Sequence, residues 1–264
     1  MARDEQRSLV EKTTILRGTV GSTVHGLHQG DQDDRDEMSI FLEPPEFLIG
    51  LRLAKSGRSW GPFEHYVERT QPEGVRSGPG DLDLVAFSLR KWLRLALSGN
   101  PTVLLLLFSP PESLLVCTER GGALRALAPA IVSRKAGPRF VGYMRAQKER
   151  LIGTRGQRRV NRPELIEAHG FDTKYAMHVA RLGLQGIELL STGRLTLPMA
   201  EPDRSRVMAI RRGDVSLEDA LAEIDDIERK LHTAVENSPL RELPDYERVD
   251  AYLIETYRDS WGWK

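Results

Sequence analysis

The chain has 264 residues, enough for one large domain or two small ones. Its 38 Lys and Arg residues balance its 38 Asp and Glu residues, so any attraction to nucleic acid or to a membrane surface must be local. The longest apolar run, residues 103–108, is far too short to span a bilayer. The N-terminus lacks the apolar core of a signal peptide, and the lone Cys117 cannot form an internal disulfide. We therefore expect a cytoplasmic protein without membrane segments.

The first predicted elements are a short helix within residues 7–12 and a β-branched strand over residues 13–17. Gly21 and Ser22 follow and predict a turn. Glycine lacks the Cβ atom that blocks close approach, so backbone N–H groups of such a turn can contact a phosphate.

Two aspartates one residue apart begin the next strand, which continues as the apolar residues 39–42. Residues i and i+2 of a strand point to the same face, so Asp34 and Asp36 are expected to project together. Paired carboxylates repel unless they are protonated or bridged by cations, and Mg²⁺ takes such ligands together with substrate phosphate oxygens. Two alternatives stay open, namely that Asp31 and Asp33 form the pair, or that the whole segment is a solvated acidic loop.

Gly21-Ser22, eleven intervening residues and then Asp34-x-Asp36 resemble the active-site signature of the DNA polymerase β-type nucleotidyltransferase superfamily. Residues 21–27 and 34–38 together resemble one branch of it, the predicted nucleotidyltransferases named for RNA repair pathways, or RlaP-like family. The resemblance implies an α/β (α+β) fold, with a minimal nucleotidyltransferase domain built on a mixed sheet and a helical C-terminal region. It also implies metal-dependent transfer of a nucleotidyl group from an NTP.

A third carboxylate is expected further along the chain, because two-metal phosphoryl chemistry uses one from a neighbouring strand. Residues 63–70 alternate as in a strand, residues 71–80 form a Gly- and Pro-rich loop, and an amphipathic helix begins near Ser88. The resemblance places the third ligand at Asp83, so the predicted catalytic and metal-binding set is Asp34, Asp36 and Asp83, holding two Mg²⁺ or Mn²⁺ ions. The alternative is that Asp83 is a turn residue or a helix N-cap.

Most of the remaining chain is predicted to be helical, with helices within 123–132, 172–190, 216–231 and 245–257. Residues 194–198 have the pattern of a short strand that ends at Pro198. We divide the chain into a catalytic domain, residues 1–132, and a mainly helical region, residues 133–264.

The segment from Arg134 to Arg162 is strongly basic and contains Phe140 and Tyr143. Such a cluster is typical of contact with a phosphate backbone, although a solvated helix face followed by a linker is the alternative. The residues predicted to bind nucleic acid are Arg145, Lys148, Arg155, Arg158 and Arg159.

Asp172 is a good N-cap for the helix that follows, on which Lys174, His178 and Arg181 lie at i, i+4 and i+7. Three potential cations on one face suit a triphosphate or developing negative charge. The resembled family carries a Lys-x-x-x-His-x-x-Arg helix at this place. The predicted nucleotide-binding residues are therefore Gly21, Ser22, Lys174, His178 and Arg181, while a solvated basic face is the alternative.

These patterns together predict a nucleotidyltransferase that acts on an NTP and an RNA acceptor, above all a tRNA 3′ end, in the cytoplasm of a bacterium or of a phage-infected host. A protein hydroxyl or a small molecule could also be the acceptor, because a fold does not fix the acceptor. The rival hypotheses are a non-catalytic nucleic-acid-binding module and a metal-dependent phosphohydrolase. The sequence does not determine the oligomeric state.

Overall fold

The computed structural model describes all residues except 29–34, 57–58, 76, 154–161 and 264. It divides into two compact units, which are described separately below. Unit 1 comprises Met1–Leu97, Val103–Ile131 and Asp245–Lys264, and unit 2 comprises Ser98–Thr102 and Val132–Pro244. Among the helices formed by the described residues, none has the length and apolar character needed to cross a membrane.

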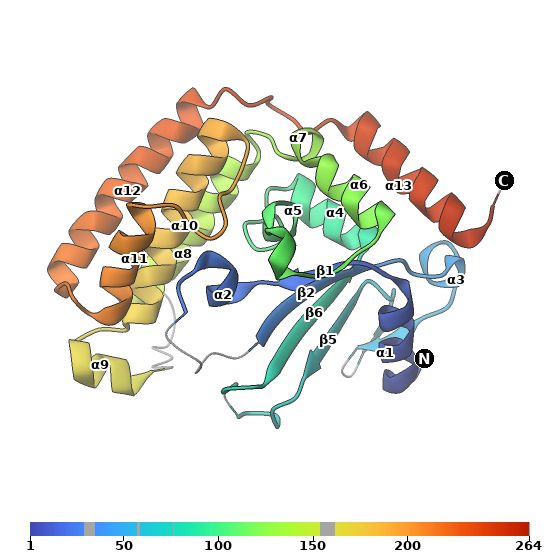
Figure 1. The fold of residues 1–264 in the computed structure, drawn as a ribbon, viewed down its shortest axis with the longest axis horizontal. Coiled ribbons are helices and arrows are strands. Elements are labelled where there is room, and N and C mark those ends of the chain that lie inside the picture. The colour runs from blue at the N-terminus through green and yellow to red at the C-terminus, as the bar shows by residue number, and fades with distance from the viewer. Residues whose placement is uncertain (29–34, 57–58, 76, 154–161, 264) are drawn as a thin grey trace. The chain divides into compact units, whose positions relative to one another are not determined.

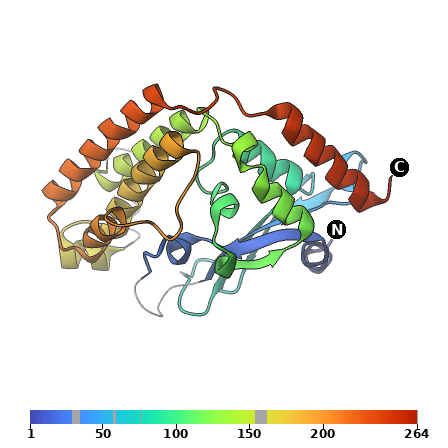
Figure 2. The ribbon, with the colours of Figure 1, turned by 45° about the horizontal axis from the view of Figure 1, so that its top comes forward.

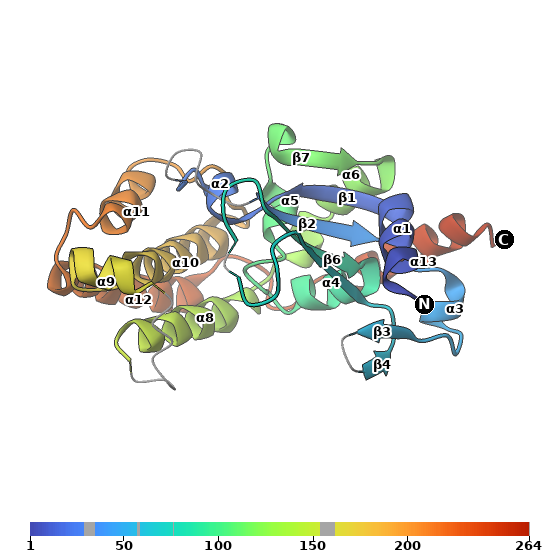
Figure 3. The same ribbon diagram turned by 90° about the horizontal axis from the view of Figure 1, so that it is seen from below.

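Unit 1 is built on a five-stranded mixed sheet with the strand order β5-β6-β2-β1-β7, as Figure 3 shows for most of the strands. The strands are β1 (Thr14–Thr19), β2 (Arg35–Phe41), β5 (His65–Arg69), β6 (Leu82–Ser88) and β7 (Leu114–Cys117). Strands β2 and β6 are parallel, and the other neighbours are antiparallel. Strands β3 (Ala54–Ser56) and β4 (Ser59–Gly61) form a separate two-stranded antiparallel sheet.

Helices cover both faces of the sheet because its strands alternate apolar side chains on both sides (Figure 1). On one face, Val10 of α1 (Arg3–Thr13) joins a core cluster with Phe41, Tyr66 and Ala86. On the other face, Leu106 of α5 (Leu105–Phe108) lies against β1 at Gly18. Helices α4 (Leu89–Leu97) and α6 (Glu119–Ala126) contact β2 and β1.

The C-terminal helix α13 (Tyr246–Trp261) also belongs to unit 1. The Tyr257 hydroxyl donates to Glu43 Oε2 at 2.6 Å, and Trp261 Nε1 donates to the Glu43 carbonyl oxygen at 3.1 Å. Because Glu43 lies two residues after the end of β2, these bonds connect the last helix to the central sheet. The remaining short helices of this unit are α2 (Gly21–His25), α3 (Pro45–Leu48), α7 (Ala128–Ile131) and the 3₁₀ turn η2 (Pro111–Ser113).

Unit 2 is a helical bundle around α10, which can be followed by its colours in Figure 2. Its helices are α8 (Ala136–Leu151), α9 (Pro163–His169), α10 (Thr173–Thr192), α11 (Asp203–Arg212) and α12 (Leu217–Asn237). Gly183 and Gly186 let neighbouring helices approach α10, since a Cβ atom at either position would overlap side chains of both α8 and α12. The predicted fold class, a mixed sheet with a helical region after it, is confirmed.

Candidate active site

Asp36 and Asp83 lie side by side on adjacent strands. Strands β2 and β6 are parallel, and Asp36 pairs with Asp83 in their register. Paired residues of parallel strands project to the same face, so the two carboxylates share one face at one end of the sheet. Both residues are half-buried. Asp34, Asp31 and Asp33 lie outside the described residues.

Gly21 provides the space in which the Asp36 carboxylate lies. Its φ angle is +70°, and a Cβ atom added to it would overlap Asp36 Oδ2. The Val20 amide donates to the Asp36 carbonyl oxygen at 2.8 Å, which holds the end of β1 against β2 at this point. The predicted Gly21-Ser22 turn is in fact the first turn of α2, which ends at His25 and is followed by the C-cap Gly26 in a left-handed conformation. A side chain at residue 21 is therefore excluded both by backbone strain and by the neighbouring carboxylate.

Asp83 lies within β6 and is neither a turn residue nor a helix cap. Arg69 Nε is 2.6 Å from its Oδ1, and Ser77 Oγ donates to its Oδ2 at 3.2 Å. The nearby Asp81 has a different role, because its carboxylate accepts from the Gly78 amide and the Thr70 hydroxyl, both at 2.9 Å. These bonds, the one to Gly78 first, hold the pKa of Asp81 below its usual value and close the loop between β5 and β6.

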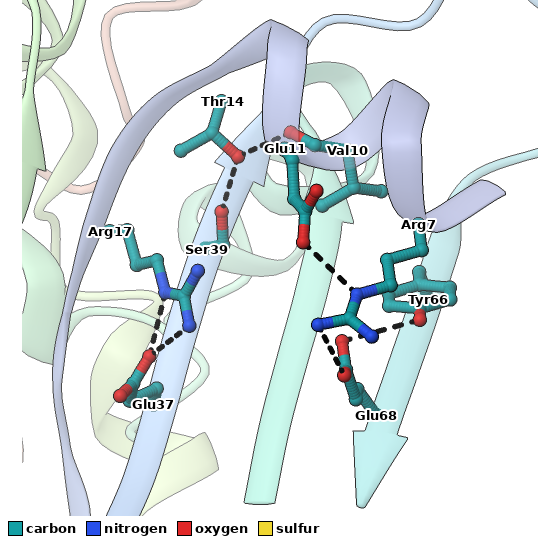
Figure 4. A network of polar contacts seen from close by, with 9 residues as sticks. All are labelled: Arg7, Val10, Glu11, Thr14, Arg17, Glu37, Ser39, Tyr66 and Glu68. Atoms are coloured by element: carbon teal, nitrogen blue, oxygen red, sulfur yellow. Dashed lines mark hydrogen bonds and ion pairs between the residues drawn. The ribbon is translucent and has the colours of Figure 1, made fainter. Parts of the chain in front are cut away.

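The opposite face of the sheet carries a polar network beneath α1 (Figure 4). Glu37 is only 6% exposed, and its Oε2 is 2.5 Å from Arg17 Nη2. The hydroxyls of Thr14 and Ser39 are 2.9 Å apart on the same pair of strands. Because neighbouring residues of a strand face opposite sides, Glu37 points away from the Asp36 carboxylate and stabilises the pairing of β1 with β2.

Of the three carboxylates predicted to bind metal, the described residues include two, Asp36 and Asp83. No group of three His, Cys, Asp or Glu side chains within the described ranges is placed to hold a metal ion. The donors that are described suit Mg²⁺ or Mn²⁺, because they are carboxylate oxygens with a glycine-lined space beside them. The residues present therefore fit a divalent-ion site to which Asp34 would add the third carboxylate.

In unit 2, the predicted stripe, defined as the three residues predicted to bind nucleotide at positions 174, 178 and 181, lies on α10. Lys174, His178 and Arg181 are each half-buried, and Arg181 Nη1 donates to Gln185 Oε1 at 2.8 Å. Desolvation lowers the pKa of Arg181 to about 10, which still leaves the guanidinium charged at neutral pH. Desolvation also lowers the pKa of His178 well below its usual 6.5.

The charges around His178 extend beyond the predicted stripe. The pKa of its imidazole, lowered first by desolvation, is lowered further by four cations, Arg181, Lys174, Arg162 and Arg211. Arg162 precedes α9, forms an ion pair with Asp172 at 3.2 Å and lies 5.5 Å from the Tyr175 ring. Arg211 comes from the end of α11. No short-range sequence pattern connects Arg162 or Arg211 with α10, so neither residue was predicted to belong to this cluster.

The basic segment has a mixed structure. Arg145 is exposed on α8, whereas Lys148 Nζ lies 2.5 Å from Asp225 Oδ1 and 2.6 Å from Glu228 Oε2. Phe140 is fully buried in the bundle, and Tyr143 is 37% exposed. Arg155, Arg158 and Arg159 lie outside the described residues.

Comparisons with known proteins identify the family of the chain. The sequence profile of the RNA repair pathway DNA polymerase beta family, RlaP, matches residues 1–255. No curated protein matches the chain. Among solved structures, a nucleotidyltransferase-like protein from Exiguobacterium sibiricum is similar with a TM-score of 0.30 and 10% sequence identity, over 97% of this chain and 80% of that chain. With the family profile covering nearly its whole length, the chain belongs to the RNA repair pathway DNA polymerase beta family and is a polymerase β-like nucleotidyltransferase.

Proposed function

We propose that the protein transfers a nucleotidyl group from an NTP to the 3′ hydroxyl of an RNA, such as a tRNA, in a reaction that depends on divalent metal ions. The observation that carries this proposal is the register of β2 and β6. It places Asp36 beside Asp83 on one face, with Gly21 leaving room for the Asp36 carboxylate. The RNA acceptor is inferred from the family and from the basic residues of α8.

Asp34, Asp36 and Asp83 would hold Mg²⁺ or Mn²⁺. When bound, two such ions neutralise the triphosphate and lower the pKa of the attacking hydroxyl. The contribution of the chain is to hold the carboxylates at a fixed separation, which the hydrogen-bonded ladder between β2 and β6 does. The Arg17–Glu37 pair on the opposite face keeps β1, and with it the Gly21 turn, in register with Asp36.

Phosphate groups of the NTP would contact Gly21 and Ser22. Lys174 and Arg181 would supply positive charge, and His178, which is uncharged at neutral pH, would supply a hydrogen bond. The support for Lys174, His178 and Arg181 comes from unit 2 alone, where four cationic side chains lower the pKa of the His178 imidazole. Such a concentration of like charge is unfavourable by itself and favours binding of a polyanion.

The test is incubation of the protein with each α-labelled NTP, Mg²⁺ or Mn²⁺, and either total RNA or total protein. We expect label in RNA, and we expect Asp36→Asn or Asp83→Asn to reduce labelling by at least about 100-fold, because bound metal supplies several kcal/mol of transition-state stabilisation. Asp81→Asn is the matched control, since Asp81 serves the loop through Gly78 and Thr70 and should retain labelling.

The rival hypotheses give different results in the same assay. Label in protein or in a small molecule would replace the RNA acceptor but keep the nucleotidyl transfer. Release of phosphate without labelling of any acceptor would indicate a phosphohydrolase. RNA binding that is unchanged in Asp36→Asn, with no labelling by the unmodified protein, would indicate a non-catalytic binding module.

A further inference from the structure

We propose that Arg69 is the resident counter-ion of Asp83, which a divalent metal ion must displace in order to bind. This inference rests on the proposed metal-dependent function and adds a residue that neither the sequence patterns nor the family match assigns. It concerns the last residue of β5, at the same end of the sheet as Asp36 and Asp83.

The placement of Arg69 follows from strand register. Strand β5 is antiparallel to β6, and Arg69 pairs with Asp83, so their side chains project to the same face. Arg69 Nε lies 2.6 Å from Asp83 Oδ1, while Ser77 Oγ donates to Oδ2 at 3.2 Å. Oδ1 is therefore in an ion pair without a hydrogen bond, and Oδ2 accepts a hydrogen bond from Ser77.

The electrostatic reason for such a cation is the neighbouring Asp36. Two carboxylates on adjacent strands repel each other when no metal ion is present, and a guanidinium beside one of them offsets that repulsion. The loop between β5 and β6, closed by the bonds of Asp81, brings Ser77 to the second oxygen of Asp83. Arg69 and Ser77 thus hold the Asp83 carboxylate in place without metal.

The ion pair between Arg69 and Asp83 is weak enough for a metal ion to displace. The Arg69 side chain is 61% exposed, so water screens its charge, and Asp83 Oδ1, although buried, accepts no hydrogen bond from it. By contrast, the Arg17–Glu37 pair on the opposite face has a carboxylate that is 6% exposed. A divalent ion at the paired carboxylates therefore outcompetes Arg69, and the released guanidinium can bind an NTP phosphate oxygen beside the metal.

The test measures Mn²⁺ binding by electron paramagnetic resonance in the absence of NTP and RNA. We expect Arg69→Ala to tighten Mn²⁺ binding by about two- to five-fold, which is the range that loss of a competing exposed ion pair predicts. The matched control is Arg94→Ala, because Arg94 is 63% exposed and pairs with Glu64 at 3.5 Å elsewhere in unit 1. It should leave the Mn²⁺ affinity unchanged.

A second measurement separates a counter-ion from a merely structural residue. Arg69→Ala should raise the KM for NTP while it tightens Mn²⁺ binding, whereas a general disruption of the site would weaken both. Arg69→Lys should lie between the unmodified protein and Arg69→Ala, since it keeps the charge and loses the guanidinium geometry.

The outcomes distinguish this inference from the function on which it rests. If the unmodified protein binds Mn²⁺ and Arg69→Ala binds it equally or more weakly, the counter-ion role is overturned and the metal-dependent function stands. If the unmodified protein binds no Mn²⁺ and transfers no label from NTP, both are overturned.

Discussion

Substitution of Gly21 combines backbone strain with steric exclusion at the site, and a control glycine is needed to separate the two effects. Gly21→Ala forces a Cβ atom into the space of the Asp36 carboxylate and also imposes a φ of +70° on alanine. We expect it to abolish NTP labelling and to lower the free energy of unfolding by more than the roughly 1–2 kcal/mol of left-handed backbone strain. Labelling and chemical denaturation measure the two effects.

The matched control for Gly21 is Gly262, at the end of α13. Gly262 has a φ of +66°, yet a Cβ atom added there meets no heavy atom within 4 Å. Gly262→Ala should therefore show only the strain and keep full labelling. Equal loss of activity in both variants, or full activity in Gly21→Ala, would contradict the placement of Asp36 against Gly21.

For single residues, the sequence predicts which side chains are candidate metal ligands better than it predicts how those side chains are placed. Spacing and family resemblance single out Asp34 and Asp36, and the resemblance alone singles out Asp83. The choice between Asp81 and Asp83 depends on the pairing of β2 with β6, a contact between distant segments. Arg69 gives no sequence signal, since an arginine at a strand end is ordinary. Its importance arises only from its register with Asp83.

The attachment of α13 to the sheet depends on the buried carboxyl group of Glu43. Burial raises the pKa of Glu43 above its usual 4.5, although the bond from Tyr257 opposes this shift. Burial also raises the pKa of the Tyr257 hydroxyl, and the neighbouring Glu43 adds to that shift, so the hydroxyl stays a donor at neutral pH. The Arg90 amide donates to the Tyr257 hydroxyl oxygen at 3.3 Å, so the same group also contacts the first residues of α4.

This arrangement predicts a pH dependence of stability. Because the folded state binds the Glu43 proton more tightly than the unfolded state, its contribution is fully present below pH 4.5 and is lost as pH rises through the raised pKa. Glu43→Gln should flatten that part of the profile of unfolding free energy against pH.

Tyr257→Phe should lower the unfolding free energy by about 1–3 kcal/mol, since it leaves a buried acceptor without its donor. Denaturant titrations over this range measure both, and an unchanged profile in Glu43→Gln would assign the slope to other groups.

The hydrophobic periodicity of a segment predicts which of its residues are buried more reliably than it predicts their backbone hydrogen bonds. Residues 194–198 were predicted to be a strand, and Leu195 and Leu197 are buried between exposed neighbours as in one. No strand forms there, because a ladder needs a partner edge that alternation alone cannot supply. Similarly, residues 245–264 read as part of a C-terminal helical region, but α13 groups with unit 1. Its bonds to Glu43 span more than 200 positions of the chain and leave no local pattern.

For the molecule as a whole, zero formal net charge means that RNA, the proposed acceptor, would have to be attracted by local groups. The exposed cations of α8 are the first candidates, and Arg139, Tyr143 and Arg150 share one face of that helix at spacings of four and seven residues. Tyr143 offers a ring for stacking with an unpaired base, and its hydroxyl accepts from Asn100 Nδ2 at 3.0 Å.

The salt dependence of RNA binding then distinguishes cations that contact RNA from cations that stabilise the fold. For a single-stranded RNA, the slope of log K against log salt should become shallower by about 0.7 in Arg145→Ala and in Arg150→Ala, because each loses one phosphate contact. Lys148→Ala should leave the slope unchanged and instead destabilise the bundle, since the Lys148 charge is already compensated by Asp225 and Glu228. Fluorescence anisotropy over a range of salt concentrations measures the slopes, and thermal denaturation measures the stability. A slope that changes in Lys148→Ala as much as in Arg150→Ala would show that RNA displaces these carboxylates, so that α8 and α12 rearrange when the protein binds its acceptor.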